Sequence, residues 1–167
     1  MNKEAGESLG GIIECAAVNV PAGVGSPIFD GLENNIAQLI FGIPSVKGLE
    51  FGAGFSTAKM IGSQSSDDFY VDEHGHVLTR TNNHGGILGG ITTGLPILFR
   101  TAVKPTPSIF KEQQTIDLNS LDNTTLQIKG RHDPAIVHRA RVVADSVTAL
   151  VLCDQLAMRF GTDWLKA

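Results

Sequence analysis

Apolar residues along this chain of 167 residues alternate between strand-like runs and helix-like stripes. A run rich in β-branched and small residues over 10–20 ends in turn-forming residues at 21–25, which predicts a strand followed by a loop. The next segment predicts a helix of about three turns between Ser26 and Gly42, because its apolar residues recur at helical spacing. These residues are Leu32, Ile36, Leu39 and Ile40.

The middle of the chain is polar and rich in glycine. We predict a short strand over 46–51 and a short helix over 53–61. Over 62–90 we expect loops with short hairpin pieces, including a turn at 72–75. Strand composition returns over 91–103, where β-branched and apolar residues are again frequent.

The last third contains the longest periodic segment. After a polar connection and a strand predicted over 124–128, the pattern over 135–160 predicts a helix about 37 Å long, ended by Gly161. Its expected apolar stripe comprises Ile136, Ala140, Val143, Val147, Leu150, Val151 and Leu156. Strands in runs with one long helix differ from regular βαβ crossover units. We therefore predict an α+β fold over 1–167 as a single domain, with an antiparallel β-sheet packed with helices (β-α-β sandwich type) and a long C-terminal helix.

Composition narrows the functional classes. Hydrophobic residues make up 42% and charged residues 18%, which excludes a disordered chain. A net charge of −4 argues against a broadly cationic nucleic-acid surface, so no nucleic-acid partner is expected. The low charge indicates surface buried between subunits. Neither a secretory signal nor a membrane-spanning run is visible, so we expect a cytoplasmic protein without a membrane partner. Cys15 and Cys153 lie in apolar stretches and are predicted to be buried thiols.

The junction Arg131-His132-Asp133-Pro134 has two compatible interpretations. Asp before Pro at the start of a helical pattern is typical of an N-cap followed by proline at the first helical position. A helix N-terminus near cationic side chains is also an anion site, so a phosphate could bind there while Asp133 handles a proton.

Two further segments leave alternatives open. Prolines stiffen Lys104-Pro105-Thr106-Pro107-Ser108, which is either a plain loop after a strand or a set of donors pre-oriented for a phosphate or a heteroaromatic edge. The glycine pairs in 82–90 lack dinucleotide-binding spacing, and indicate either tight packing or close approach of the backbone to a flat ligand. His74 and His76 are expected to be exposed hairpin residues, since no further ligand lies at a recognised metal spacing. We predict no metal site.

Several motifs in a fixed order carry a family resemblance: GGIIE, VPAGVGSPIFDGL, VKGLEFGAGF, NNHGGILGG, KPTPSI and GRHDP. With these motifs the chain closely resembles the C-terminal half of chorismate synthase over nearly all of its length. The resemblance implies a lyase of the shikimate pathway for aromatic amino acid biosynthesis, which converts enolpyruvylshikimate phosphate to chorismate and phosphate. It also implies a requirement for reduced FMN, with NADPH as reductant in bifunctional members, and a homotetramer.

The resemblance also implies roles for particular residues. Asp133 corresponds to the catalytic acid that manages the flavin N5 proton, and Arg131 serves both the flavin and the substrate. The implied cofactor-binding residues are Pro44, Ser45, Gly89, Lys104, Pro105, Thr106, Pro107, Ser108 and Arg131.

This sequence also departs from the family pattern. A Gly-Glu-Ser-His-Gly segment with a catalytic histidine, a second catalytic histidine, several substrate arginines and an Arg-Ser-Ser flavin contact belong to the family's N-terminal half and are absent here. Ser45 stands where alanine is usual. We therefore expect the 167-residue chain to be inactive by itself. The alternative is a stand-alone module that binds a phosphorylated ligand, or mediates oligomerisation, without catalysis.

Overall fold

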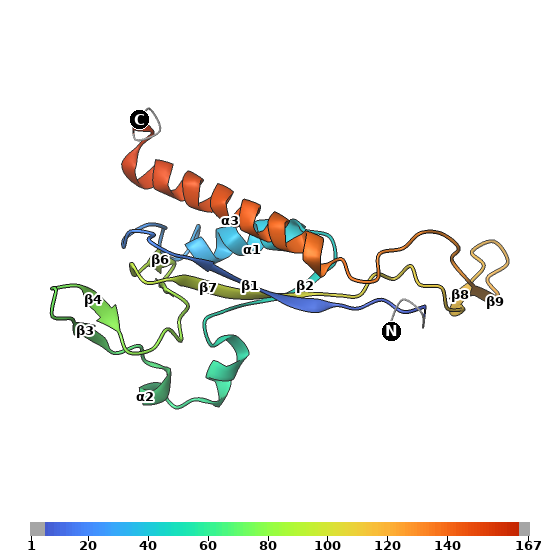
Figure 1. The fold of residues 1–167 in the computed structure, drawn as a ribbon, viewed down its shortest axis with the longest axis horizontal. Coiled ribbons are helices and arrows are strands. Elements are labelled where there is room, and N and C mark those ends of the chain that lie inside the picture. The colour runs from blue at the N-terminus through green and yellow to red at the C-terminus, as the bar shows by residue number, and fades with distance from the viewer. Residues whose placement is uncertain (1–5, 164–167) are drawn as a thin grey trace.

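A three-stranded antiparallel sheet with two helices on one face forms the centre of the fold (Figure 1). The structure is a computed structural model and describes residues 6–163. It confirms the predicted α+β class, the antiparallel pairing and the long C-terminal helix. In spatial order the strands are β1 (Gly11–Ala17), β7 (Ile97–Val103) and β2 (Val46–Phe51), and the helices are α1 (Leu32–Gly42) and α3 (Val137–Phe160).

The hydrophobic core lies between this sheet and the two helices. Alternate residues of β7 face the core, and Ile97 and Phe99 are fully buried there. Facing them, α1 contributes Leu32, Ile36 and Ile40, which recur every four residues and are also fully buried. Alternation with a period of two gives the sheet a second face, which neither helix covers.

Helix α1 is shorter than the sequence predicts. It begins at Leu32 rather than near Ser26, and the Leu32 N–H donates to the Gly90 carbonyl at 2.9 Å. The backbone before it is not helical, since Ile28 has a φ of 66°. The helix ends at Gly42, as predicted, and Leu39 lies at its partly exposed edge.

The polar middle of the chain contains short elements. The strand predicted over 46–51 is confirmed as β2, whereas the helix predicted over 53–61 is a 3₁₀ helix, η1 (Gly54–Lys59), followed by α2 (Gly62–Ser65). The expected hairpin pieces are β3 (Phe69–Val71) and β4 (Val77–Thr79), joined by the predicted turn at 72–75.

His74 and His76 lie on this turn and are exposed, as predicted, and both backbone N–H groups donate to the Asp72 carboxylate. Within 6–163 no three His, Cys, Asp or Glu side chains are grouped so as to hold a metal ion.

Two strand predictions need correction. The predicted strand over 91–103 is divided into β6 (Ile91–Thr92) and β7, since Pro96 lies between them and cannot donate to a ladder. β6 pairs with β5 (Ile87–Leu88) in a tight hairpin. The polar connection contains a missed strand, β8 (Gln113–Ile116), which pairs with β9 (Asn123–Leu126).

Helix α3 buries a face that differs from the predicted stripe. Val143 and Leu150 are 43% and 63% exposed, so their predicted burial is wrong. Small side chains spaced four residues apart instead face α1 and β1 and allow close packing. The buried residues of α3 are Ala140, Ala144, Thr148, Val151, Leu152 and Gln155. Gly161, with a φ of 74°, ends the helix as predicted.

The two cysteines occupy different environments. Cys15 is buried beneath α3, and burial raises the pKa of its thiol, which makes it unreactive. Cys153 is exposed, so the prediction of burial is wrong there. The helical period turns its side chain outward, because Val151 and Leu152 occupy the core-facing positions. No helix within residues 6–163 is both long and apolar enough to cross a membrane.

Candidate functional site

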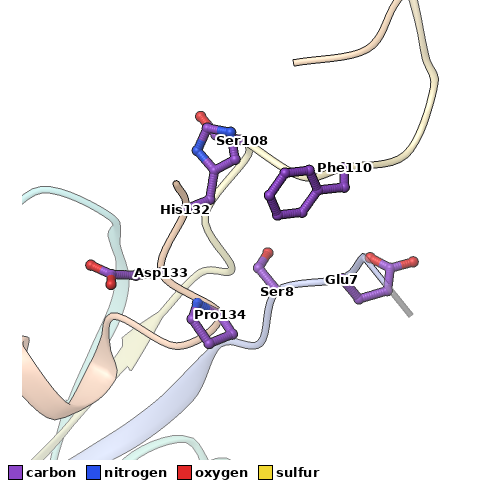
Figure 2. Close-up of a pocket in the computed structure, with 7 residues that line it drawn as sticks. All are labelled: Glu7, Ser8, Ser108, Phe110, His132, Asp133 and Pro134. Atoms are coloured by element: carbon purple, nitrogen blue, oxygen red, sulfur yellow. The ribbon is translucent and has the colours of Figure 1, made fainter. Parts of the chain in front are cut away.

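Three loop segments meet at the end of the sheet where β1 begins and β7 ends. They are residues 7–10, 104–108 and 131–134, and we call them the loop cluster (Figure 2). The first leads into β1, the second leaves β7 and the third approaches α3. Antiparallel pairing of β1 with β7, with Gly11 opposite Val103, places the first two segments side by side.

Two hydrogen bonds, one from a side chain and one from the backbone, hold the loop cluster together. The Ser8 hydroxyl donates to the Thr106 carbonyl at 2.6 Å. The Leu9 N–H donates to the Pro134 carbonyl at 2.7 Å. Segment 7–10 therefore lies between the other two and links them, although they are far apart in the sequence.

Pro44 and Ser45 join this arrangement from the end of α1. The Lys104 N–H donates to the Ser45 carbonyl at 2.8 Å, which brings the predicted flavin dipeptide to the predicted phosphate loop. Ser45 has a φ of 75°, a left-handed conformation that side chains other than glycine rarely adopt. This strain directs the Ser45 carbonyl at the loop cluster, and such strain is typical of functional sites.

Close backbone packing fixes the proline-containing segment. A Cβ at Gly10 would lie 2.5 Å from the Val103 carbonyl oxygen and 3.0 Å from the Pro105 ring, so only glycine fits there. Thr106 Oγ1 is buried and has no hydrogen-bond partner among the described residues. A buried hydroxyl without a partner is costly, which makes Thr106 a candidate ligand contact.

Asp133 is not an N-cap, contrary to the prediction. Helix α3 begins at Val137, its N-cap position is Ile136, and no side chain caps it. The helix begins later than predicted because the residues before it pair with the segment that leads into β1. The Pro134 carbonyl accepts a hydrogen bond from the Leu9 N–H, and this pairing holds the chain extended before α3. The Asp133 carboxylate instead pairs with Arg139 at 2.7 Å.

His132 packs against an aromatic side chain that the sequence analysis did not single out. Its ring lies 5.3 Å from the Phe110 ring, centroid to centroid, at an angle of 60°. Its Nε2 atom is buried without a partner among residues 6–163. Figure 2 shows Ser8 beneath these two rings and the Asp133 carboxylate directed away from Phe110. The hollow between them measures about 10 Å³, which is room for about one water molecule.

Cationic side chains surround the loop cluster. Lys104, Lys129 and Arg131 are exposed, and within the described part of the chain none of them forms an ion pair. The nearby acids Glu7 and Asp133 are paired, with Lys111 and Arg139 respectively. These three cations have no ion pair in the described chain, and binding of an external anion by them stays a prediction.

Gly89 does not belong to the loop cluster. Gly89 follows β5, and the carbonyl of the adjacent Gly90 accepts a hydrogen bond from Leu32, the first residue of α1. Pro44 and Ser45 instead lie just after the C-terminal end of α1. The 11 residues of α1 correspond to a separation of about 16 Å.

Three glycines of 82–90 bear out tight packing, one of the two interpretations that the sequence left open. A Cβ at Gly85, Gly86 or Gly90 would clash with backbone atoms, which confirms tight packing at these positions. At Gly89 a Cβ would meet nothing within 4 Å, so close packing does not require glycine there, and approach of a ligand to its backbone stays a prediction.

A buried carboxylate that the sequence analysis missed shapes the loop before these glycines. Asp67 is 8% exposed and accepts hydrogen bonds from the Thr81 hydroxyl and from the N–H groups of Asn83 and His84. Burial by itself would raise the pKa of Asp67, but these hydrogen bonds lower it below its ordinary value. No local pattern indicated this role, because the partners lie 14 to 17 residues away.

Exposed cations without an ion pair in the described chain lie in and beside the loop cluster, and side chains of this kind suit an anionic ligand. Comparison with known proteins identifies the family. The family model described as chorismate synthase matches residues 1–157. The chain belongs to the chorismate synthase family.

Individual relatives agree with this assignment. Chorismate synthase of Dehalococcoides mccartyi is 49% identical over 158 residues, which cover 95% of this chain and 43% of the relative. The enzyme of Korarchaeum cryptofilum is 52% identical over 151 residues, covering 90% and 42%. A crystal structure of chorismate synthase superimposes with a TM-score of 0.76 at 37% identity, and covers 95% of this chain and 40% of that one. The chain thus spans less than half the length of the relatives it matches.

Proposed function

We propose that this chain supplies the C-terminal part of a chorismate synthase. The proposed activity is that of a lyase in the shikimate pathway, which converts enolpyruvylshikimate phosphate to chorismate and phosphate with reduced FMN. The observation that carries the proposal is the loop cluster, where the Lys104 N–H donates to the Ser45 carbonyl and where Ser8, Ser108 and Asp133 line one hollow. A cytoplasmic homotetramer, and reduction of the flavin by NADPH in a bifunctional enzyme, form part of the same proposal.

The residues present fit an anionic, flat cofactor. Thr106 offers a buried hydroxyl without a partner in the described chain, and Lys104 and Arg131 offer unpaired charge for a phosphate. Segment 104–108 and the pair Pro44-Ser45 would form the main cofactor surface, and Gly89 would contribute from the opposite end of α1. Reduced FMN, when bound, supplies electron density as the substrate phosphate departs.

Within this proposal the protein positions charges and handles a proton. Arg131 binds the anionic groups of the cofactor and the substrate, and Asp133 holds the proton at flavin N5. The Asp133 carboxylate is 41% exposed and its pair with Arg139 is at the surface, so the pair contributes at most about 1 kcal/mol. A ligand can therefore displace Arg139 and recruit Asp133.

The catalytic role of Asp133 is tested by Asp133→Asn in a complete enzyme. The chain would be coexpressed with the N-terminal part of a relative, such as the Methanosarcina barkeri enzyme. Turnover of the variant should fall by a factor of about 100 or more, because general acid–base catalysis contributes that much. FMN affinity, measured by flavin fluorescence, should not change.

The exposed Asp30 provides a matched control, since Asp30→Asn should retain full turnover. Full turnover of Asp133→Asn with flavin bound would contradict the role of Asp133. If the unaltered assembly binds FMN and substrate but forms no chorismate, the lyase proposal is wrong and the alternative of a binding module without catalysis replaces it.

A further inference from the structure

The proline-containing segment 104–108 offers few groups by which the rest of the chain can hold it. Pro105 and Pro107 have no N–H, so at these two positions the backbone can only accept hydrogen bonds. A residue before proline is also disfavoured in the helical region, which favours an extended Thr106 and makes the segment stiff. The orientation of the segment therefore depends on donors that reach its carbonyls.

Two side chains donate to adjacent carbonyls of this segment. The Ser8 hydroxyl donates to the Thr106 carbonyl at 2.6 Å, and the Gln113 side chain donates to the Pro107 carbonyl at 2.9 Å. The bond from Ser8 is partly buried, whereas the bond from Gln113 is exposed. A hydrogen bond that is shielded from water is electrostatically stronger, so Ser8 is the firmer of the two anchors.

Ser8 presents its hydroxyl from a backbone that is itself held on both sides. The Leu9 N–H donates to the Pro134 carbonyl at 2.7 Å, and the Phe110 N–H donates to the Gly6 carbonyl at 3.1 Å. Figure 2 shows Ser8 between the rings of Pro134 and Phe110. The place of the Ser8 hydroxyl is thus fixed by residues outside the segment that it holds.

Thr106 is the residue at which this anchor affects a ligand. Its Oγ1 atom is buried without a hydrogen-bond partner within residues 6–163, which costs free energy until another molecule bonds to it. The carbonyl and the hydroxyl belong to the same residue, and threonine has few χ1 rotamers. The bond that fixes the carbonyl therefore also limits where the hydroxyl points.

We propose that Ser8 is a positioning residue of the candidate site, which holds the Thr106 carbonyl and thereby directs the Thr106 hydroxyl to the ligand. The inference deepens the proposed function and rests on it, because the ligand is taken to be FMN. The sequence by itself indicates no such role for Ser8, since its partner lies 98 residues away.

A double-mutant cycle tests whether Ser8 acts through Thr106. The chain, coexpressed with the N-terminal part of the Methanosarcina barkeri enzyme, would carry Ser8→Ala, Thr106→Val or both. Each single variant should weaken FMN binding about tenfold, because each removes one hydrogen bond on the same path to the ligand. The double variant should also weaken it about tenfold, rather than about a hundredfold, since residues that act through one contact are not additive. Flavin fluorescence measures the affinities.

Two further variants separate positioning from a general loss of structure. Ser8→Thr keeps a hydroxyl on the same Cβ and should bind FMN more tightly than Ser8→Ala. Ser146→Ala is the matched control, because it removes a hydroxyl of α3 that donates to the Val142 carbonyl at 2.8 Å, and it should leave FMN affinity unchanged. Urea unfolding checks that each variant is folded. Ser8→Cys, a weak donor of similar size, replaces Ser8→Ala if that variant is unfolded.

A second readout needs neither FMN nor the N-terminal part. In the chain alone, the backbone order parameter of Thr106 from NMR relaxation should be near the rigid value of about 0.85, and should fall below about 0.6 in Ser8→Ala. The order parameter of Ala144, which is fully buried in α3, should stay at the rigid value in both. This comparison decides whether Ser8 holds Thr106 even if the assembly does not bind FMN, an outcome that would contradict the proposed function instead.

Four results would overturn the proposal. These are a Ser8→Ala assembly with the FMN affinity of the unaltered one, single effects that add in the double variant, a Ser8→Thr assembly that binds no better than Ser8→Ala, and an order parameter of Thr106 that is the same with and without the Ser8 hydroxyl.

Discussion

The Asp67 carboxylate has three hydrogen-bond donors and is almost fully buried. It fixes the backbone at Asn83 and His84, directly before the glycine-rich turns. The last glycine of these turns, Gly90, accepts a hydrogen bond from the first residue of α1. Its pKa is lower in the folded chain than in the unfolded chain. Its contribution to stability is therefore fully present above the unfolded pKa of about 3.9 and is lost as the pH falls through the folded pKa.

Asp67→Asn should lower the free energy of unfolding at pH 7 by about 1–3 kcal/mol, because buried donors lose their charged acceptor. The difference between the unaltered chain and the variant should shrink below about pH 4. Urea unfolding at pH 7 and pH 3, followed by circular dichroism, measures both effects. The exposed neighbour serves as control, as Asp68→Asn should unfold like the unaltered chain. A difference that grew on acidification would contradict this account.

At the scale of elements, the face of α3 that is buried depends on the elements that pack against it, which are α1 and β1. Ala140 and Ala144 pack against α1 and β1, while the larger Val143 beside them faces solvent. Side-chain hydrophobicity by itself would place Val143 inside. Close approach of two helices favours alanine at the contact, and this leaves the bulkier residue outside.

Ala144→Leu should destabilise the fold by about 1–3 kcal/mol, because Ala144 is fully buried and the added methylenes overpack the helix contact. The adjacent substitution Val143→Leu is a matched control on the same helix, and should change the free energy of unfolding by less than about 0.5 kcal/mol. Urea denaturation of both variants measures the difference. Equal stability of the two would show that α3 is rotated relative to this description.

At the scale of the whole molecule, the chain has a real core but only part of a ligand site. The hollow inside the loop cluster holds about one water molecule, and Gly89 lies at the far end of α1. The relatives have more than twice the length of the matched segment, since it covers 43% of the first of them. At the loop cluster the described residues therefore do not enclose a space of cofactor size by themselves.

The 167-residue chain alone should accordingly bind FMN weakly or not at all. Titration of FMN into the chain, followed by quenching of flavin fluorescence, should give no saturation at micromolar concentration. Adding the N-terminal part of a relative should restore saturable binding. Tight, stoichiometric binding by the chain alone would show that the pocket is complete without that part.

Local chemistry explains which features of the fold and site could be predicted. Three features depend only on interactions between residues that are close in the sequence, so the pattern predicted them correctly. They are the turn at 72–75, the apolar periodicity of α1 and the glycine that ends α3. The N-cap prediction at Asp133 was wrong because a long-range contact, from Leu9 to Pro134, holds the chain before the helix extended. The contact between Phe110 and His132 and the contacts of Asp67 bridge 14 or more residues, and no local signal encodes them.

The sequence by itself determined the fold class, the family and the residue types of the candidate site, since these depend on local periodicity and on motifs in a fixed order. Only the tertiary structure decided which of those residues meet. Pairing of β1 with β7 brings Ser8 and Thr106 together, while α1 separates Gly89 from Ser45. It also decided which apolar residues stay exposed, because burial depends on the packing partner as well as on hydrophobicity.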